Sequence, residues 1–169
     1  NLRNVARALG KPLEHLRMVT LDKPRLQNAI AEATQLGVKV FALPDGDVAA
    51  SVLTCLQDNP YDLMYTTGGA PEGVISACAV KALGGDMQAE LIDFCEAKGE
   101  SPENRRVAVQ EHRRCAEMKV EVNRIYTLSE LVKGNDILFS ATGVTGGELV
   151  KGIQQVAKGE IGRASCRER

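Results

Sequence analysis

Apolar residues in the first half of the chain alternate between short continuous runs and stripes at helical spacing. Three strands are predicted, at 18–21, 38–43 and 63–66, and each is followed by a polar loop and a helix. The helices are expected from Pro24 to a stop at Gly37, from an N-cap at Asp47 to just before Asn59, and over 72–83. Residues 38–43 are apolar and rich in β-branched and aromatic side chains except at Lys39, which predicts a strand buried on both faces.

Three strand–loop–helix passes predict an α/β fold with a mixed or mostly parallel sheet and helices on its faces. Further along, strands are expected at 87–94, 125–127 and 136–141 (the last one buried), helices at 2–9, 129–132 and 148–156, and a loop at 95–101. Residues 102–118 carry interleaved acids and bases, which favours an exposed helix with ion pairs between its turns. The last residues are basic and follow no period, so we expect a lobe over 1–159 and a disordered or non-native tail over 160–169.

Composition narrows the class of protein. The 169 residues include 21 Lys and Arg against 22 Asp and Glu, a formal charge of −1, so no bulk field favours nucleic acid or an anionic membrane. The sequence contains no run of 18 apolar residues, so no membrane span is predicted. The chain opens without Met, directly in an amphipathic pattern, and we expect it to be a piece of something longer. Five scattered cysteines favour a reducing, cytoplasmic compartment, with Cys55, Cys78 and Cys95 as small buried residues.

Ligands of α/β sheets bind outside the carboxyl ends of the strands, so the loops there are the first place to look for chemistry. The loop after the first predicted strand holds Lys23 and Arg25 on either side of Pro24, at a helix start. Two cations and a positive helix end could face one anion, such as a phosphate. The alternative is that both are solvated side chains of a first helical turn.

Acidic residues follow the other two strands. Asp45 and Asp47 flank Gly46, and their carboxylates could accept sugar hydroxyls or hold a hard cation. Turn chemistry for Asp45 and an N-cap for Asp47 explain the same residues without a ligand. Glu72 begins a helix after Gly-Gly-Ala-Pro, where it could bind a metal or simply complement the helix dipole.

Several common sites are excluded by spacing. The glycine-rich stretch 142–147 contains neither a P-loop nor a G-x-G-x-x-G signature, and no Gly-x-Ser-x-Gly elbow occurs. His15 and His112 both lie in polar helical surroundings and are expected to be solvated. No residue is therefore nominated as catalytic.

At these loops the sequence resembles one family specifically. The motifs Leu-Asp-Lys-Pro-Arg at 21–25, Leu-Pro-Asp-Gly-Asp-Val at 43–48, Thr-Gly-Gly-Ala-Pro-Glu-Gly at 67–73 and Leu-Phe-Ser-Ala-Thr-Gly-Val-Thr-Gly-Gly at 138–147 occur in order. Together they resemble the C-terminal half of bacterial class II fructose-1,6-bisphosphatases of the glycerol-regulon type. The resemblance runs from Asn1 to about Gly159. It implies a layered sugar-phosphatase fold of the inositol-monophosphatase-like superfamily, in which this segment is the C-terminal α/β lobe.

The resemblance also implies roles. The family removes the 1-phosphate of fructose 1,6-bisphosphate with Mn²⁺ or Mg²⁺, in the cytoplasm, and membership suggests a homo-oligomer. Carried onto this chain, its substrate-binding residues match Lys23, Pro24, Arg25, Asp45, Gly46, Asp47 and Gly69, and a metal ligand matches Glu72.

One departure limits what the chain should do alone. The family's Gly-Glu-Gly-Glu and Asp-Pro-x-Glu-Gly-Thr elements, which carry most metal ligands and activate water, do not occur here. We therefore expect a substrate-binding part that is inactive by itself. Two alternatives stay open: a preference for sedoheptulose 1,7-bisphosphate, and a non-catalytic phosphosugar-binding or assembly module.

Overall fold

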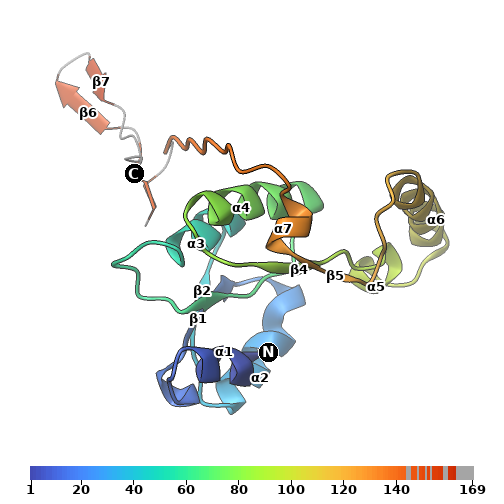
Figure 1. Ribbon diagram of the computed structural model, residues 1–169, viewed down its shortest axis with the longest axis horizontal. Coiled ribbons are helices and arrows are strands. Elements are labelled where there is room, and N and C mark those ends of the chain that lie inside the picture. The colour runs from blue at the N-terminus through green and yellow to red at the C-terminus, as the bar shows by residue number, and fades with distance from the viewer. Residues whose placement is uncertain (144–145, 148, 151, 153, 158–159, 163–169) are drawn as a thin grey trace. The chain divides into compact units, whose positions relative to one another are not determined.

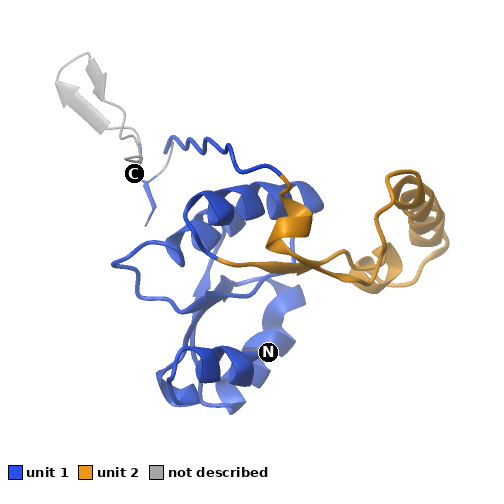
Figure 2. Ribbon diagram, viewed as in Figure 1, with its two compact units in different colours: residues 1–85, 134–169 blue, residues 86–133 orange. Residues whose placement is uncertain are grey.

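A computed structural model describes residues 1–143, 146–147, 149–150, 152, 154–157 and 160–162. The chain divides into two compact units, one formed by 1–85 with 134–169 and the other by 86–133 (Figure 2). Unit 1 contains, in order, α1 (Leu2–Ala8), η1 (Leu13–His15), β1 (Arg17–Leu21), η2 (Pro24–Leu26), α2 (Gln27–Gln35), β2 (Lys39–Leu43), α3 (Asp47–Leu53), β3 (Leu63–Met64), α4 (Ala70–Ala82), β6 (Gln154–Ala157) and β7 (Glu160–Gly162). Unit 2 contains β4 (Gln88–Glu90), α5 (Phe94–Lys98), α6 (Pro102–Glu117), β5 (Ile125–Thr127) and α7 (Leu128–Leu131).

The sheet of unit 1 is parallel and has the order β2–β1–β3, and β1 and β2 are labelled in Figure 1. Leu21 of β1 pairs with Leu43 of β2, and Val19 pairs with Met64 of β3. The first strand in sequence is thus the middle strand of the sheet. The predicted α/β class with a mostly parallel sheet is confirmed, and the loops after all three strands leave the same edge.

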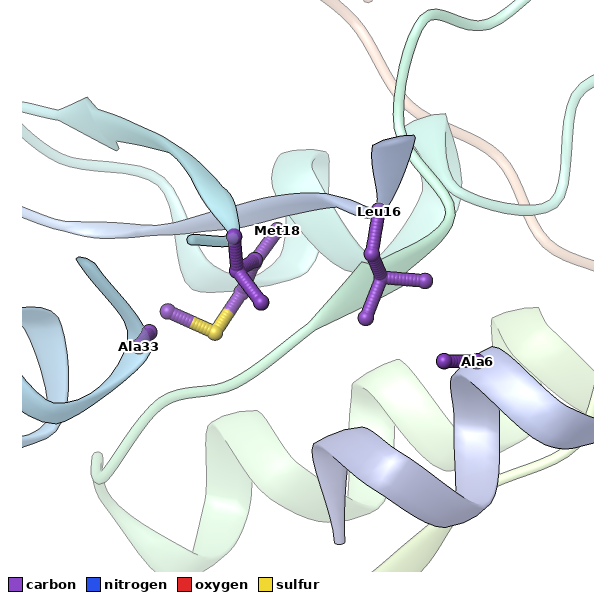
Figure 3. Packing of buried hydrophobic residues seen from close by; sticks show 5 residues of the cluster. Ala6, Leu16, Met18 and Ala33 are labelled. Carbon is purple, nitrogen blue, oxygen red and sulfur yellow. The ribbon is translucent and has the colours of Figure 1, made fainter. Parts of the chain in front are cut away.

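Each face of this sheet carries its own core. Side chains alternate along a strand, so Met18 packs with Leu16, Ala6 of α1 and Ala33 of α2 on one face (Figure 3). Val19 packs on the other face with Ala50 and Leu53 of α3, and α3 lies beside α4. Leu16 and Val19 have no exposed surface. The two helical layers fix β1 and hence the loop that follows it.

Unit 2 is built on an antiparallel pair, in which Gln88 of β4 faces Thr127 of β5. Asp93 caps α5, because its Oδ1 accepts hydrogen bonds from the backbone N–H groups of Cys95 and Glu96. The charged helix predicted over 102–118 is confirmed as α6, with an ion pair between Arg113 and Glu117 at 3.0 Å.

The prediction that residues 38–43 are buried on both faces was wrong. β2 forms, but in the described residues it pairs only with β1, and Lys39, Phe41 and Ala42 are exposed. Phe41 as a whole residue is 39% exposed. The apolar run indicates a strand correctly, whereas burial depends on what lies beside an edge strand.

Predictions for three other segments were also wrong. Residues 136–141 form no strand, and Leu138 is 81% exposed, because an apolar run becomes a strand only when another strand pairs with it. The helix predicted over 148–156 conflicts with β6, and 148, 151 and 153 lie outside the described residues. The loop predicted at 95–101 was wrong over 95–98, which belong to α5. In the expected tail over 160–169, the first three residues form β7 and 163–169 lie outside the described residues, so the expectation of a disordered or non-native tail stays a prediction.

Within the part of the chain that the structure describes, no helix is both long and apolar enough to cross a membrane. The cysteine prediction was wrong in detail. Cys55, Cys78 and Cys95 are half-buried, whereas Cys115 is buried, and all four are free thiols. Cys166 lies outside the described residues.

Candidate functional site at the carboxyl edge of the sheet

The loop after β1 reaches both of its neighbours. Lys23 precedes Pro24, which holds it in an extended conformation, and its Nζ lies 2.6 Å from Oδ1 of Asp45 in the loop after β2. On the other side of the proline, Nε of Arg25 donates to the carbonyl oxygen of Thr67 after β3, at 2.5 Å. The two cations are therefore anchored to the two flanking loops, one on each side.

The loop after β2 is shaped by a glycine. Gly46 has φ +105°, in the left-handed region that a side chain disfavours, and it is the N-cap of α3. Asp47 is the first residue of the helix rather than its cap, so the N-cap explanation of Asp47 was wrong. Without the capping role, the Asp47 carboxylate is available for another contact.

Two carboxylates lie against the loop after β3. A methyl group added to Gly68 would collide with Oδ2 of Asp47, and one added to Gly69 would collide with Oε2 of Glu72. Gly69 is the N-cap of α4, and Glu72 stands in the first turn of that helix. Asp47 and Glu72 thus approach neighbouring residues of one glycine pair, and a side chain at either glycine would require the facing carboxylate to move.

The structure brings together the residues nominated from sequence. Lys23, Pro24, Arg25, Asp45, Gly46, Asp47, Gly69 and Glu72 all lie in or directly after the loops at one edge of the β2–β1–β3 sheet. Sequence reasoning missed Thr67 and Gly68 as partners within this edge. Their signal was the position of both directly after a predicted strand. The glycine-rich stretch 142–147 lies partly outside the described residues, at 144–145.

The histidines lie elsewhere. His15 precedes β1, at the opposite end of that strand from Lys23. His112 belongs to unit 2, and its Nε2 lies 2.7 Å from Oδ2 of Asp93, so the prediction of a merely solvated imidazole was incomplete. A surface hollow beside the end of α6, lined by His112, Cys115 and Val120 among others, also belongs to unit 2 and not to this edge.

The chemistry of the edge suits a phosphorylated polyol. Guanidinium and ammonium groups bind phosphate, and carboxylates accept hydroxyl hydrogen bonds. Glu72 offers the hard oxygen donor that Mn²⁺ and Mg²⁺ prefer, so it fits as one metal ligand. Among the described residues no group of three or more His, Cys, Asp or Glu side chains could hold a metal ion. A complete metal site would need ligands beyond these residues.

Fold and site together define an α/β protein with a polar, phosphate-compatible edge at the carboxyl ends of its parallel strands. The family model of bacterial, glpX-encoded fructose-1,6-bisphosphatase matches residues 1–165, and the chain belongs to this family.

Curated relatives agree with this assignment. The chain is 82% identical over 159 residues to fructose-1,6-bisphosphatase 2 class 2 of Escherichia coli strain K12, which covers 94% of the chain and 50% of that protein. It is 51% identical over 161 residues to fructose-1,6-bisphosphatase 1 class 2 of the same strain, covering 95% and 47%. For the class 2 enzyme of Haemophilus influenzae the identity is 50% over 155 residues, which make up 92% of the chain and 46% of that protein. The chain spans about half the length of these relatives.

Proposed function

We propose that this chain is the substrate-binding part of a fructose-1,6-bisphosphatase, which hydrolyses the 1-phosphate of fructose 1,6-bisphosphate and gives fructose 6-phosphate. The proposal rests on one observation: the cations, carboxylates and glycines of the motifs at 21–25, 43–48 and 67–73 gather at one edge of the sheet. The names of the relatives support the substrate. In the proposed whole protein this segment is the C-terminal lobe of a layered fold related to inositol monophosphatases.

Each residue of the edge has a proposed role. Arg25 and Lys23 hold the phosphate that is retained, and Asp45 and Asp47, on either side of Gly46, accept the sugar hydroxyls. The backbone N–H of Gly69 donates to the substrate. Pro24 fixes the direction in which the two cations leave the chain.

Glu72 is the proposed ligand of Mn²⁺ or Mg²⁺. When bound, such an ion would offset the negative charge of the phosphoryl oxygens and make the phosphorus atom a better electrophile. The other ligands, and the groups that activate water, would come from outside these residues, so the isolated chain is proposed to be inactive. The proposed setting is the cytoplasm, with a homo-oligomeric whole protein and neither nucleic acid nor membrane as partner.

The test is complementation. The chain is assayed for phosphate release with Mn²⁺ and fructose 1,6-bisphosphate, alone and mixed with the separately expressed N-terminal half of the Escherichia coli relative. Activity only in the mixture supports the proposal. The matched control is Glu72→Gln, which keeps the size of the side chain and removes its charge. A folded chain that binds bisphosphate without metal and gives no active mixture would contradict the proposal and support a non-catalytic module. Comparing kcat/KM for sedoheptulose 1,7-bisphosphate in the active mixture identifies the preferred sugar.

A further inference from the structure

The hydrogen bond from Arg25 Nε to Thr67 crosses from the loop after β1 to the loop between β3 and α4, two segments 42 residues apart in sequence. Arg25 is exposed, and Thr67 is half-buried. The hydrogen bond therefore lies at the surface and is not part of a hydrophobic core. It joins a cation of the site to the loop that carries Gly69 and Glu72.

The geometry of a guanidinium group permits two functions at once. The guanidinium has five N–H donors: the one on Nε donates to the Thr67 carbonyl, and the two terminal nitrogens carry the other four in the same plane. Among the described residues, Thr67 is the only acceptor recorded for Arg25. The fixed Nε sets the direction of the remaining fork, which is the part that can bind a phosphate in two-point fashion.

The acceptor is well placed to transmit this constraint. The Thr67 carbonyl belongs to the peptide group whose N–H is that of Gly68, so holding the carbonyl orients the Thr67–Gly68 peptide plane. Gly68 and the following Gly69 lie against the carboxylates of Asp47 and Glu72. A glycine pair has more conformational freedom than any other dipeptide, so an external contact is needed to keep it in one conformation.

We propose that Arg25 is a positioning residue for the β3–α4 loop: its Nε holds the Thr67 carbonyl and thereby places Gly69 and Glu72, while its terminal nitrogens remain available to a phosphate. The phosphate role and the metal role of Glu72 rest on the proposed function. The positioning role itself rests only on the contact with Thr67.

The first test measures amide hydrogen exchange in the 169-residue chain, without substrate or metal. Arg25→Lys keeps the positive charge but cannot reproduce the Nε geometry, and Arg25→Ala removes both. We expect exchange in the peptide covering 67–73 to become about 10-fold faster in both variants, the loss typical of one hydrogen bond from a charged donor. Lys23→Gln is the matched control, because it removes the cation on the other side of Pro24, which contacts Asp45 instead, and should leave this peptide unchanged. Unchanged exchange in both Arg25 variants would overturn the proposal.

The second test uses a full-length chimera in which residues 1–159 replace the matching part of the Escherichia coli relative. A residue that only grips substrate raises KM when it is changed. Changing a residue that also positions Glu72 lowers kcat and weakens Mn²⁺ binding to the substrate-free protein. A loss of about 10-fold in Mn²⁺ affinity is expected when a residue that orients a metal ligand is changed. We expect Arg25→Lys to show both losses and Lys23→Gln to change KM alone. An Arg25→Lys variant with altered KM and unaltered Mn²⁺ binding would contradict positioning. A Glu72→Gln variant that keeps Mn²⁺ affinity and activity would instead contradict the proposed function, and the exchange result would stand apart from it.

Discussion

Nζ of Lys23 and Oδ1 of Asp45 lie 2.6 Å apart and join the loops that follow the two neighbouring strands β1 and β2. The Asp45 side chain is 82% exposed, and Lys23 is 29% exposed. In such surroundings an ion pair is screened by water and salt.

We therefore expect little stability from this pair. In a double-mutant cycle of Lys23→Gln and Asp45→Asn, the coupling in the free energy of unfolding should stay below about 1 kcal/mol, while substrate affinity falls in each variant. Urea denaturation and KM of the full-length chimera measure the two effects. Asp62→Asn is the contrasting variant. Asp62 is 13% exposed and accepts from both Lys11 and the Arg17 N–H, so its loss should destabilise more. A coupling energy of several kcal/mol between Lys23 and Asp45 would contradict this view of the pair.

Gly69→Ala should disturb the site without unfolding the protein. The added methyl group would meet the Glu72 carboxylate, which must then move. We expect a higher Mn²⁺ requirement in the chimera and an unchanged circular dichroism spectrum.

Gly73→Ala is the matched control for that variant, because Gly73 lies in α4 and a methyl group there meets nothing within 4 Å. Alanine should stabilise this helix by about 0.5–1 kcal/mol and leave the metal requirement as it was. Equal metal requirements in the two variants would show that the Gly69–Glu72 approach does not matter.

Leu16→Ala should be among the most damaging changes outside the site. Leu16 is fully buried and packs with Met18 and Ala6 (Figure 3). Removing its side chain leaves a cavity between the sheet and α1, at a cost of about 2–5 kcal/mol. Thermal and urea denaturation check the value, with exposed Leu138→Ala as the control that should change stability little. Equal losses would contradict the assignment of the core.

Acid should loosen α5. Burial raises the pKa of Asp93, but the N–H groups of Cys95 and Glu96 and the nearby His112 outweigh it and hold that pKa below the ordinary value of 3.8. A lowered pKa in the folded state means that the carboxylate stabilises the fold above about pH 4. This contribution is lost as the pH falls through the folded-state pKa.

The corresponding measurement is amide exchange in α5 from pH 6 to pH 3, corrected for intrinsic rates. The amides of α5 in the native chain should lose protection as the pH approaches 3. In Asp93→Asn they should be less protected already at pH 6, and their protection should depend less on pH. A variant with the same acid response as the native chain would show that another group is responsible.

The sequence predicts much of unit 1 because its signals are local. Gly37 has φ +83°, as a helix stop requires, and Pro24 opens a helical turn where its fixed φ is favourable. The site could be predicted for the same reason: parallel strands bring the loops containing Lys23, Asp45 and Glu72 to one edge.

What could not be predicted depends on neighbours distant in sequence. The apolar run that becomes β2 says nothing about lying at a sheet edge, and the run at 136–141 says nothing about lacking a pairing strand. The contact between Arg25 and Thr67 depends on the strand order, which no local pattern encodes. α5 was missed for a different reason, since Asp93 followed by Glu96 is a recognisable helix start.

The antiparallel pairing of β4 with β5 has a consequence for the evolution and engineering of this chain. Because Glu90 faces Ile125, the 34 residues 91–124 leave and return at adjacent points of a two-stranded stem. A two-residue Asn-Gly turn could close that stem, since such turns match the twist of paired strands. Because all the nominated site residues lie within 23–72, we expect such a replacement of residues 91–124 to leave the site edge intact.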